Sequence, residues 1–361
     1  MINRAAAVHR ALPETSRLVA SAIGPICSCA VIHVRHKGAI VHEAAFGDVV
    51  PGGPHAAVDA VFDLASLTKI AVGTALLVLH DRRRFALDDS IVAVFPDFAG
   101  RDPRRAKVTF RHLLAHTSGL PPSVNARAEF DAASVVQRIC ATPLASAPGE
   151  RVAYSDCGFI LVGEAVARLA GVPLPIALQS LVFDPLGIST CGYRPQGELL
   201  DRIVCTERDE WRGKLLRGEV HDETCWSMGG IAGHAGLFGT AAEMALIAEL
   251  YREAGRTEGR RILLRPTAAA AVREQARSED ERRGLAWALK SSDARPWGPA
   301  LSTASYGHTG YTGTSMFVDP LRGLTVLLLT NRVYVSRAAG PIAELRAAVH
   351  DSVIADLGLG D

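Results

Sequence analysis

The spacing of apolar residues predicts strands near both ends of the chain. Residues 27–34 and 39–47 have a strand-like pattern and are separated by a short turn, which predicts a β-hairpin. Residues 311–318 and 324–330 flank a second turn, at residues 319–323, and predict another hairpin. Both ends of the chain are therefore expected to contribute strands to a sheet.

Helical periodicity dominates the region between these hairpins. Apolar residues recur with a helical period over residues 134–140, 158–170, 174–183 and 241–254, and further helices are expected over residues 4–22 and 338–357. Strands at both ends with helices between them predict an α+β fold. In this fold the two termini build one antiparallel sheet flanked by helices, and a helical lobe is inserted between them.

Composition narrows the possible classes of protein. The 361 residues are 48% hydrophobic and 21% charged, which suffices for one large two-lobed domain or for two domains. The formal net charge of +1 gives no reason to expect nucleic acid or a membrane surface as a partner. Short arginine runs are expected to be solvated faces. The oligomeric state is left open.

The N-terminal segment and the cysteines bear on localisation. Residues 1–18 contain Arg4, Arg10 and Glu14 without an apolar core, so no secretory signal is recognised. No uninterrupted apolar run of about 18 residues predicts a membrane span. The seven cysteines are odd in number and scattered, which is typical of reduced thiols. We therefore expect a cytoplasmic protein.

A candidate nucleophile lies in the segment Ser66-Leu67-Thr68-Lys69. Ser66 precedes a long apolar stretch that predicts a helix, and Lys69 follows one turn later on the same face. An amine in that position can accept the proton of a serine hydroxyl, which is a weak nucleophile until a base is within reach. The S-x-x-K pattern is typical of penicillin-recognising serine enzymes.

Two later segments supply the remaining parts of such a site. Tyr154-Ser155-Asp156 precedes a buried helix and offers a second acid or base. His308-Thr309-Gly310 precedes the predicted strand 311–318, whose edge can offer a backbone N–H to a developing oxyanion.

These motifs resemble those of the serine β-lactamase-like hydrolases of the class C type. That group includes class C β-lactamases, D-alanyl-D-alanine carboxypeptidases, D-aminopeptidases, esterases and transacylases. Segments 109–120, 148–149 and 233–240 also look like family features, and the resemblance spans residues 25–335. It implies a β-lactamase-like, penicillin-recognising fold forming one catalytic unit. We expect an α/β lobe with the sheet at residues 1–84 and 285–361, and a mostly helical lobe at residues 85–284.

The resemblance also implies roles for individual residues. Ser66 would be acylated, Lys69 would help to deprotonate it, and Tyr154 would relay the proton to or from the leaving group. The backbone N–H groups of Ser66 and Tyr311 would form the oxyanion hole. The residues expected to bind substrate are Asp156, His308, Thr309 and Gly310.

Two positions depart from the family pattern. His308 replaces a lysine, and a histidine is mostly neutral near pH 7, which weakens the case for a carboxylate-bearing substrate such as a β-lactam. Asp156 replaces an asparagine, and an ionised carboxylate only accepts hydrogen bonds. Asp156 could hold Lys69 charged, which would favour Tyr154 over Lys69 as the base.

Other residues invite alternative interpretations. His112 and His116 have a spacing that can bind zinc, but no acidic residue completes an H-E-x-x-H motif, so capping and packing are expected. Cys205, His221 and Cys225 match no standard metal site. The glycine-rich segment 229–236 is expected to be a turn near the active-site rim, and the residues just before it could touch the substrate: His221, Asp222 and Trp226.

The leading hypothesis is a serine hydrolase that cleaves an ester or amide of a small molecule through an acyl-Ser66 intermediate, without metal or cofactor. Its expected partner is a small-molecule acyl donor, joined by an acyl acceptor if the enzyme transfers the group. The alternatives are a transacylase, then a β-lactamase or D,D-carboxypeptidase, then a non-catalytic ligand-binding member of the family. The motifs are compatible with both hydrolysis and acyl transfer.

Overall fold

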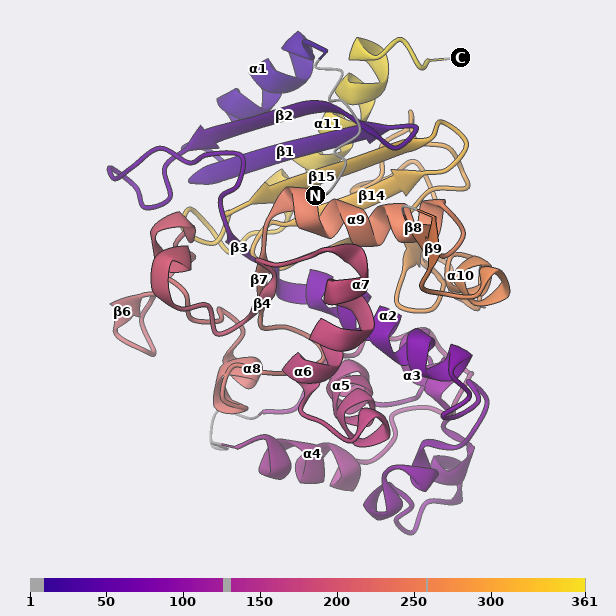
Figure 1. The fold of residues 1–361 in the computed structure, drawn as a ribbon. Helices are drawn as coiled ribbons and strands as arrows, with labels where there is room; N and C mark the ends of the chain where they lie inside the picture. The colour runs from indigo at the N-terminus through magenta and orange to yellow at the C-terminus, as the bar shows by residue number, and fades with distance from the viewer. Residues whose placement is uncertain (1–9, 126–130, 258, 361) are drawn as a thin grey trace.

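The computed structural model describes residues 10–125, 131–257 and 259–360 and is built around an eight-stranded antiparallel sheet (Figure 1). The strand order is β10-β11-β12-β13-β14-β15-β1-β2, so the first strands of the chain pair with the last. The strands are β1 (Cys29–His36), β2 (Ala39–Gly47), β10 (Ala276–Arg277), β11 (Arg282–Arg283), β12 (Ala288–Leu289), β13 (Tyr306–Thr309), β14 (Ser315–Asp319) and β15 (Leu324–Thr330). The predicted α+β sheet built from both termini is confirmed.

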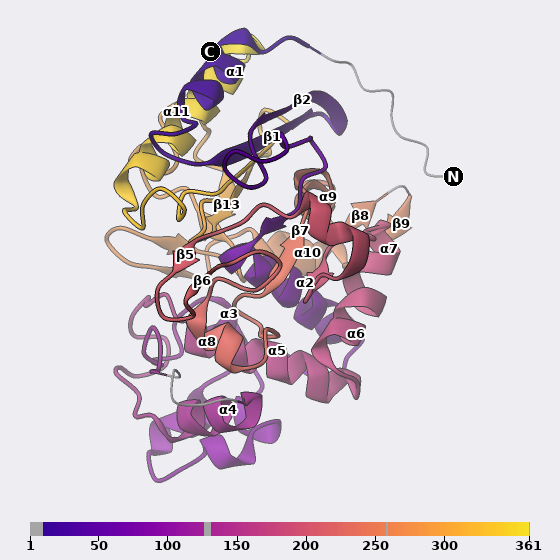
Figure 2. The same ribbon diagram turned by 90° about the vertical axis from the view of Figure 1, so that its left-hand side faces the viewer.

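Helices cover both faces of this sheet, which explains why its central strands are buried throughout. In β1, Ile32 and Val34 pack on one face with α11, whereas Val31 packs on the other face. The first face carries the neighbouring helices α1 (Pro13–Ser21) and α11 (Gly340–Asp356), seen side by side in Figure 2. The second face carries α9 (Ala241–Arg252), which contacts β1, β14 and β15.

The helix α2 (Thr68–Asp81) runs through the middle of the molecule (Figure 1). Its residues from Thr68 to Leu79 are all buried, as expected for a helix that is apolar on every side. Most other helices lie on the side of α2 away from the sheet: α3 (Phe110–Leu114), α4 (Ala132–Ala141), α5 (Asp156–Ala170), α6 (Leu174–Leu178) and α8 (Glu223–Ser227). The short helix α7 (Asp184–Leu186) lies at the level of α2. The short helix α10 (Arg265–Ala271) precedes β10.

Short strands complete the fold. A three-stranded sheet has the order β3-β7-β4, and two hairpins pair β5 with β6 and β8 with β9. Strand β3 of the three-stranded sheet immediately precedes the Ser66 segment along the chain. These strands are β3 (Phe62–Asp63), β4 (Gly192–Tyr193), β5 (Arg208–Asp209), β6 (Lys214–Leu215), β7 (Leu237–Gly239), β8 (Arg256–Thr257) and β9 (Arg260–Arg261).

Several predicted boundaries differ from the structure. The strand predicted over residues 311–318 begins only at Ser315, because residues 310–314 form a turn that packs against the Ser66 segment. The helix predicted over residues 4–22 spans Pro13–Ser21, and residues 1–9 lie outside the described part. The large sheet begins at Ala276, inside the stretch assigned to the helical lobe, and α9 from that stretch packs on it. The division into two lobes stays a prediction.

Among the described residues, no single helix is long and apolar enough to cross a membrane. Helix α5 and residues 174–186 together have sufficient length and apolar composition, but the chain bends by 77° between them.

Candidate active site

Ser66 lies in a strained turn between β3 and α2. The residue before it, Ala65, has a φ of +47°, which is uncommon for a residue with a side chain. The buried carboxylate of Asp63 holds this turn, because it accepts hydrogen bonds from Ala65 N at 2.9 Å and from His221 N at 2.7 Å. The surrounding structure therefore maintains the strain at the residue that precedes the candidate nucleophile.

Lys69 lies one turn into the helix, with its amine against Ser66. Its Nζ is 2.9 Å from Ser66 Oγ, 3.1 Å from the carbonyl oxygen of His234 and 2.7 Å from Asp156 Oδ1. Burial lowers the pKa of Lys69, but the charges of Tyr154 and Asp156 outweigh it and leave the pKa raised. Lys69 is therefore cationic near neutral pH. An ammonium has three donors and no lone pair, so it donates to Ser66 Oγ and cannot take its proton.

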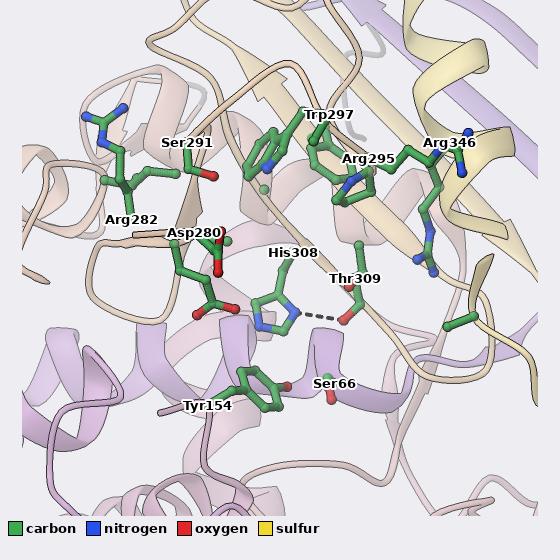
Figure 3. A pocket seen from close by; sticks show the side chains of 18 of the residues that line it. Ser66, Tyr154, Asp280, Arg282, Ser291, Arg295, Trp297, His308, Thr309 and Arg346 are labelled. Carbon is green, nitrogen blue, oxygen red and sulfur yellow. Dashed lines mark hydrogen bonds between the residues drawn. The ribbon is translucent and has the colours of Figure 1, made fainter. Parts of the chain in front are cut away.

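Tyr154 lies just before α5 and faces Ser66 (Figure 3). Its ring stacks on His116 with centroids 4.6 Å apart, and His116 Nδ1 accepts a hydrogen bond from Ser155 N at 3.0 Å. The ammonium of Lys69 is 4.8 Å from the centroid of the Tyr154 ring, and the guanidinium of Arg283 is 5.4 Å from it. Both contacts place a cationic side chain beside the Tyr154 ring.

His308 lies on β13, across the cavity from Tyr154. Its Nδ1 is 2.9 Å from the carbonyl oxygen of Thr309, so this nitrogen carries the proton. Its Nε2 is buried and has no hydrogen-bond partner among the described residues. Burial, followed by the charges of Lys69 and Arg283, holds the pKa of His308 well below its usual value. The ring is therefore neutral, and Nε2 is a free acceptor.

The turn after β13 is bound against the Ser66 segment. Thr312 Oγ1 donates to Asp63 O at 2.8 Å, and Thr314 Oγ1 donates to Leu64 O at 3.0 Å. A side chain at Gly310 would put its Cβ 2.1 Å from Thr314 Oγ1, so only glycine fits this approach. These contacts bring Tyr311 to the same cavity as Ser66.

A cavity of about 600 Å³ opens over Ser66 (Figure 3). Six of the predicted site residues line it: Ser66, Tyr154, His308, Thr309, Gly310 and Tyr311. Lys69 and Asp156 do not line it. Asp156, which was expected to bind substrate and which could also hold Lys69 charged, is paired with Lys69. Chemically, the arrangement offers a hydroxyl, a neighbouring cation, a phenol and a neutral imidazole around one open space.

The sequence analysis gave no role to His234, whose backbone helps to hold Lys69. His234, in the glycine-rich segment, offers its carbonyl to Lys69, and its Nε2 is 2.9 Å from Asp222 Oδ1. Although burial opposes ionisation, His234 holds the pKa of Asp222 well below its usual range. A Cβ at Gly233 would lie 2.0 Å from Phe159 O, so the segment needs glycine to pack on α5. The match of segment 233–240 to the family pattern was the available signal.

The alternative metal sites do not form among the described residues, where no group of three metal-ligating side chains is found. His112 Nδ1 instead accepts a hydrogen bond from Thr109 N and caps α3. His221 stacks on Tyr311 with centroids 5.7 Å apart and contacts Glu207 through Nε2 at 2.6 Å. The residues expected near the substrate, His221, Asp222 and Trp226, do not line the cavity.

The chain is similar to known proteins over most of its length. The Beta-lactamase family model matches residues 26–350. An N-acetylmuramyl-L-alanine amidase of Bacillus subtilis (strain 168) is 30% identical over 340 residues, covering 84% of this chain and 77% of the relative. A putative D-alanyl-D-alanine carboxypeptidase of Escherichia coli (strain K12) is 31% identical over 301 residues, covering 75% of this chain and 69% of the relative.

Solved structures show the same fold at lower identity. EstCE1, described as a hydrolase with promiscuous acyltransferase activity, superposes with a TM-score of 0.77 at 19% identity, covering 94% of this chain and 97% of that one. A class C β-lactamase from Rhodobacter sphaeroides gives a TM-score of 0.76 at 18% identity, covering 95% and 99%. With the family model matching most of its length, the chain belongs to the β-lactamase family of serine hydrolases and acyltransferases.

Proposed function

We propose that the protein hydrolyses a small ester or amide through an acyl-enzyme on Ser66. The observation that carries this proposal is the position of Ser66 Oγ, 2.9 Å from the Lys69 amine and on the surface of the cavity shared with Tyr154. A nucleophile held beside a cation and a candidate base is the arrangement that covalent catalysis needs.

In the proposed reaction, Tyr154 is the base and Lys69 is an electrostatic partner. Ser66 Oγ attacks the substrate carbonyl while its proton passes to the side-chain oxygen of Tyr154, the proposed base. The N–H groups of Ser66 and Tyr311 donate to the oxyanion that forms. Collapse of this intermediate breaks the bond to the leaving group, which receives the proton from Tyr154. Water then attacks the acyl carbonyl and gives a proton to Tyr154. Collapse of this second intermediate breaks the bond between the acyl carbon and Ser66 Oγ, which takes the proton back from Tyr154, and the carboxylic acid product leaves.

The charge on Lys69 supports this assignment of the base. Its Nζ is 2.7 Å from the Asp156 carboxylate, which the family's asparagine would not supply. A protonated Lys69 stabilises the negative charge that develops on the attacking oxygen, because opposite charges at short range attract.

Two of the relatives near 30% identity are named as an amidase and a putative carboxypeptidase, and both names describe amide cleavage. We therefore propose an amide as the physiological bond, with activated esters serving as convenient probes. Transfer of the acyl group to an amine or alcohol is the alternative outcome of the same intermediate.

We further propose a cytoplasmic location. All seven cysteines are free and buried, and burial raises the pKa of Cys27 and of Cys157 to about 12. Such thiols remain protonated and need no oxidising compartment. Cell fractionation of the producing organism tests this, and recovery of the protein outside the cytoplasm would contradict it.

Hydrolysis of p-nitrophenyl acetate tests the proposed function. Ser66→Ala is expected to lower kcat/KM by at least about 10³-fold, because it removes the nucleophile. Ser291→Ala is the matched control, since Ser291 also lines the cavity but takes no part in the proposed reaction. Retention of activity in Ser66→Ala with an unchanged thermal melt would refute the proposal.

A further inference from the structure

The charged residues around the cavity do not all have partners. Arg282 pairs with Glu274 at 2.6 Å, and Arg283 pairs with Glu281 at 2.9 Å. Arg295, on the opposite wall, pairs with Glu344. These three arginines are therefore compensated within the protein and offer little net charge to a ligand.

Two carboxylates at the same end of the cavity remain without partners. Glu279 and Asp280 form the tip of the hairpin between β10 and β11 and are exposed. Both line the cavity, and neither side chain has an ion pair or hydrogen bond among the described residues. Figure 3 shows Asp280 on the side of the cavity where His308 faces Tyr154.

His308 adds a second, independent feature at this end. Its side chain lines the cavity, the residue is only 4% exposed, and its Nε2 has no partner. Because Nδ1 donates to the Thr309 carbonyl, Nε2 can only accept a hydrogen bond. A buried acceptor without a donor is costly, so a ligand that supplies an N–H is favoured there.

Two arginines that have no ion pair within the described part of the chain lie beyond Thr309, on the other side of Ser66. Arg346 Nη2 donates to Gly310 O at 3.1 Å and to Thr314 O at 2.9 Å, and Arg332 Nε donates to Tyr311 O at 2.8 Å. These arginines brace the turn after β13. Figure 3 shows Arg346 and Asp280 at opposite ends of the cavity, so the arginines do not neutralise the acidic end.

We propose that the acidic end of the cavity, formed by Glu279, Asp280 and His308 Nε2, binds a protonated amine of the substrate. The ammonium donates one N–H to His308 Nε2 and faces the two carboxylates. The inference rests on the proposed function, because the amine must lie beside the bond that Ser66 attacks. It narrows the substrate class to esters or amides that carry a primary or secondary amine near the scissile carbonyl.

Binding of two arylboronic acids tests the subsite, because boronic acids add reversibly to a nucleophilic serine. The probes are 3-(aminomethyl)phenylboronic acid, which is cationic, and 3-ethylphenylboronic acid, its neutral isostere. We expect the wild type to bind the cationic probe about tenfold more tightly, which corresponds to the combined strength of exposed ion pairs and one hydrogen bond. Glu279→Gln/Asp280→Asn should reduce this preference to about twofold.

A matched pair of substitutions controls for net charge. Glu198 and Asp201 are exposed, lie outside the cavity lining and have no side-chain partners among the described residues. Glu198→Gln/Asp201→Asn should keep the tenfold preference.

Three results would count against the proposal. Equal binding of the two probes by the wild type, or a preference unchanged in Glu279→Gln/Asp280→Asn, would overturn the amine subsite alone. If neither probe bound the wild type, the reactive Ser66 of the proposed function would fail, and the subsite with it.

Discussion

Two parts of the site differ in how their polar groups are paired. The helix side comprises Ser66 and the groups around Lys69, and the strand side comprises His308 on β13 and the turn between β10 and β11. On the helix side, Lys69 contacts Ser66, Asp156 and the His234 carbonyl, so its ammonium is saturated. On the strand side, His308 Nε2 and the side chains of Glu279 and Asp280 have no partners among the described residues. Under the two proposals made above, the reactive groups are fixed within the protein and the recognition groups are left for a ligand.

This difference has an energetic reason. A buried ammonium is tolerated only when it is paired and hydrogen-bonded, so the helix side must be complete before substrate arrives. The lack of a hydrogen-bond donor to His308 Nε2 lowers the stability of the protein, but it allows the substrate to supply that donor. Substitutions on the helix side should therefore affect turnover, and those on the strand side should affect which substrate is chosen.

The largest effect after loss of Ser66 itself is expected from Tyr154→Phe. It removes the proposed base while keeping the ring between His116 and Lys69, and we expect kcat to fall about 10²- to 10⁴-fold with little change in KM. Steady-state kinetics with p-nitrophenyl acetate measures this. Tyr193→Phe is the control, since Tyr193 bonds the Ala232 carbonyl away from the cavity. An unchanged kcat in Tyr154→Phe would contradict the assignment of Tyr154 as the base and would favour Lys69 in that role.

Asp63→Asn should weaken the helix side through the turn. Asp63 accepts hydrogen bonds from both Ala65 N and His221 N, and an asparagine must present its NH₂ to one of these donors. A buried donor left unsatisfied costs about 1–3 kcal/mol, so the free energy of unfolding measured in urea should fall by that amount, together with kcat. No loss of either would show that the strained turn does not depend on Asp63.

Asp156→Asn should change the pH dependence of the helix side. Burial lowers the pKa of Lys69, and the charges of Tyr154 and Asp156 raise it; without the Asp156 charge the pKa falls. If a cationic Lys69 is required, activity is lost as pH rises through this pKa, so the alkaline limb of the pH–rate profile should move to lower pH. Asp88→Asn, which removes an acid paired with Arg111, should leave the limb in place. An unmoved limb in Asp156→Asn would contradict the requirement.

The smallest effect is expected from His308→Lys on the strand side. A fixed positive charge replaces a neutral acceptor, so the preference for the aminomethyl boronic acid over the ethyl compound should disappear or reverse, a change of about tenfold. Competitive inhibition constants measure it. A cation preference that survives this substitution would locate amine recognition elsewhere.

The sequence predicted the parts of the site that depend on local spacing. Ser66 and Lys69 are one helical turn apart. The hairpins predicted over residues 27–47 and 311–330 both form, although the first strand of the second hairpin begins only at Ser315. His234 lies 165 positions from Lys69 along the chain, and only tertiary packing brings its carbonyl to the amine. Residues 311–314 have strand-like composition, but their hydrogen bonds to the Ser66 segment make them a turn.

The same limit applies to the acidic end of the cavity. Glu279 and Asp280 belong to a polar stretch without periodicity, and only the short strands β10 and β11 bring their turn to the cavity. The neutral state of His308 was expected from its ordinary pKa. Its deep burial and the neighbouring Lys69 and Arg283 charges, which strengthen that state, could not be inferred from the sequence.

The central claim, an acyl-enzyme on Ser66, is tested most directly by intact-protein mass spectrometry after brief mixing with p-nitrophenyl acetate, followed by peptide mapping. The account predicts one acetyl group on Ser66 in the wild type, a longer-lived adduct in Tyr154→Phe if any forms, and no adduct at this position in Ser66→Ala. Acetylation confined to other residues, with turnover intact, would contradict it.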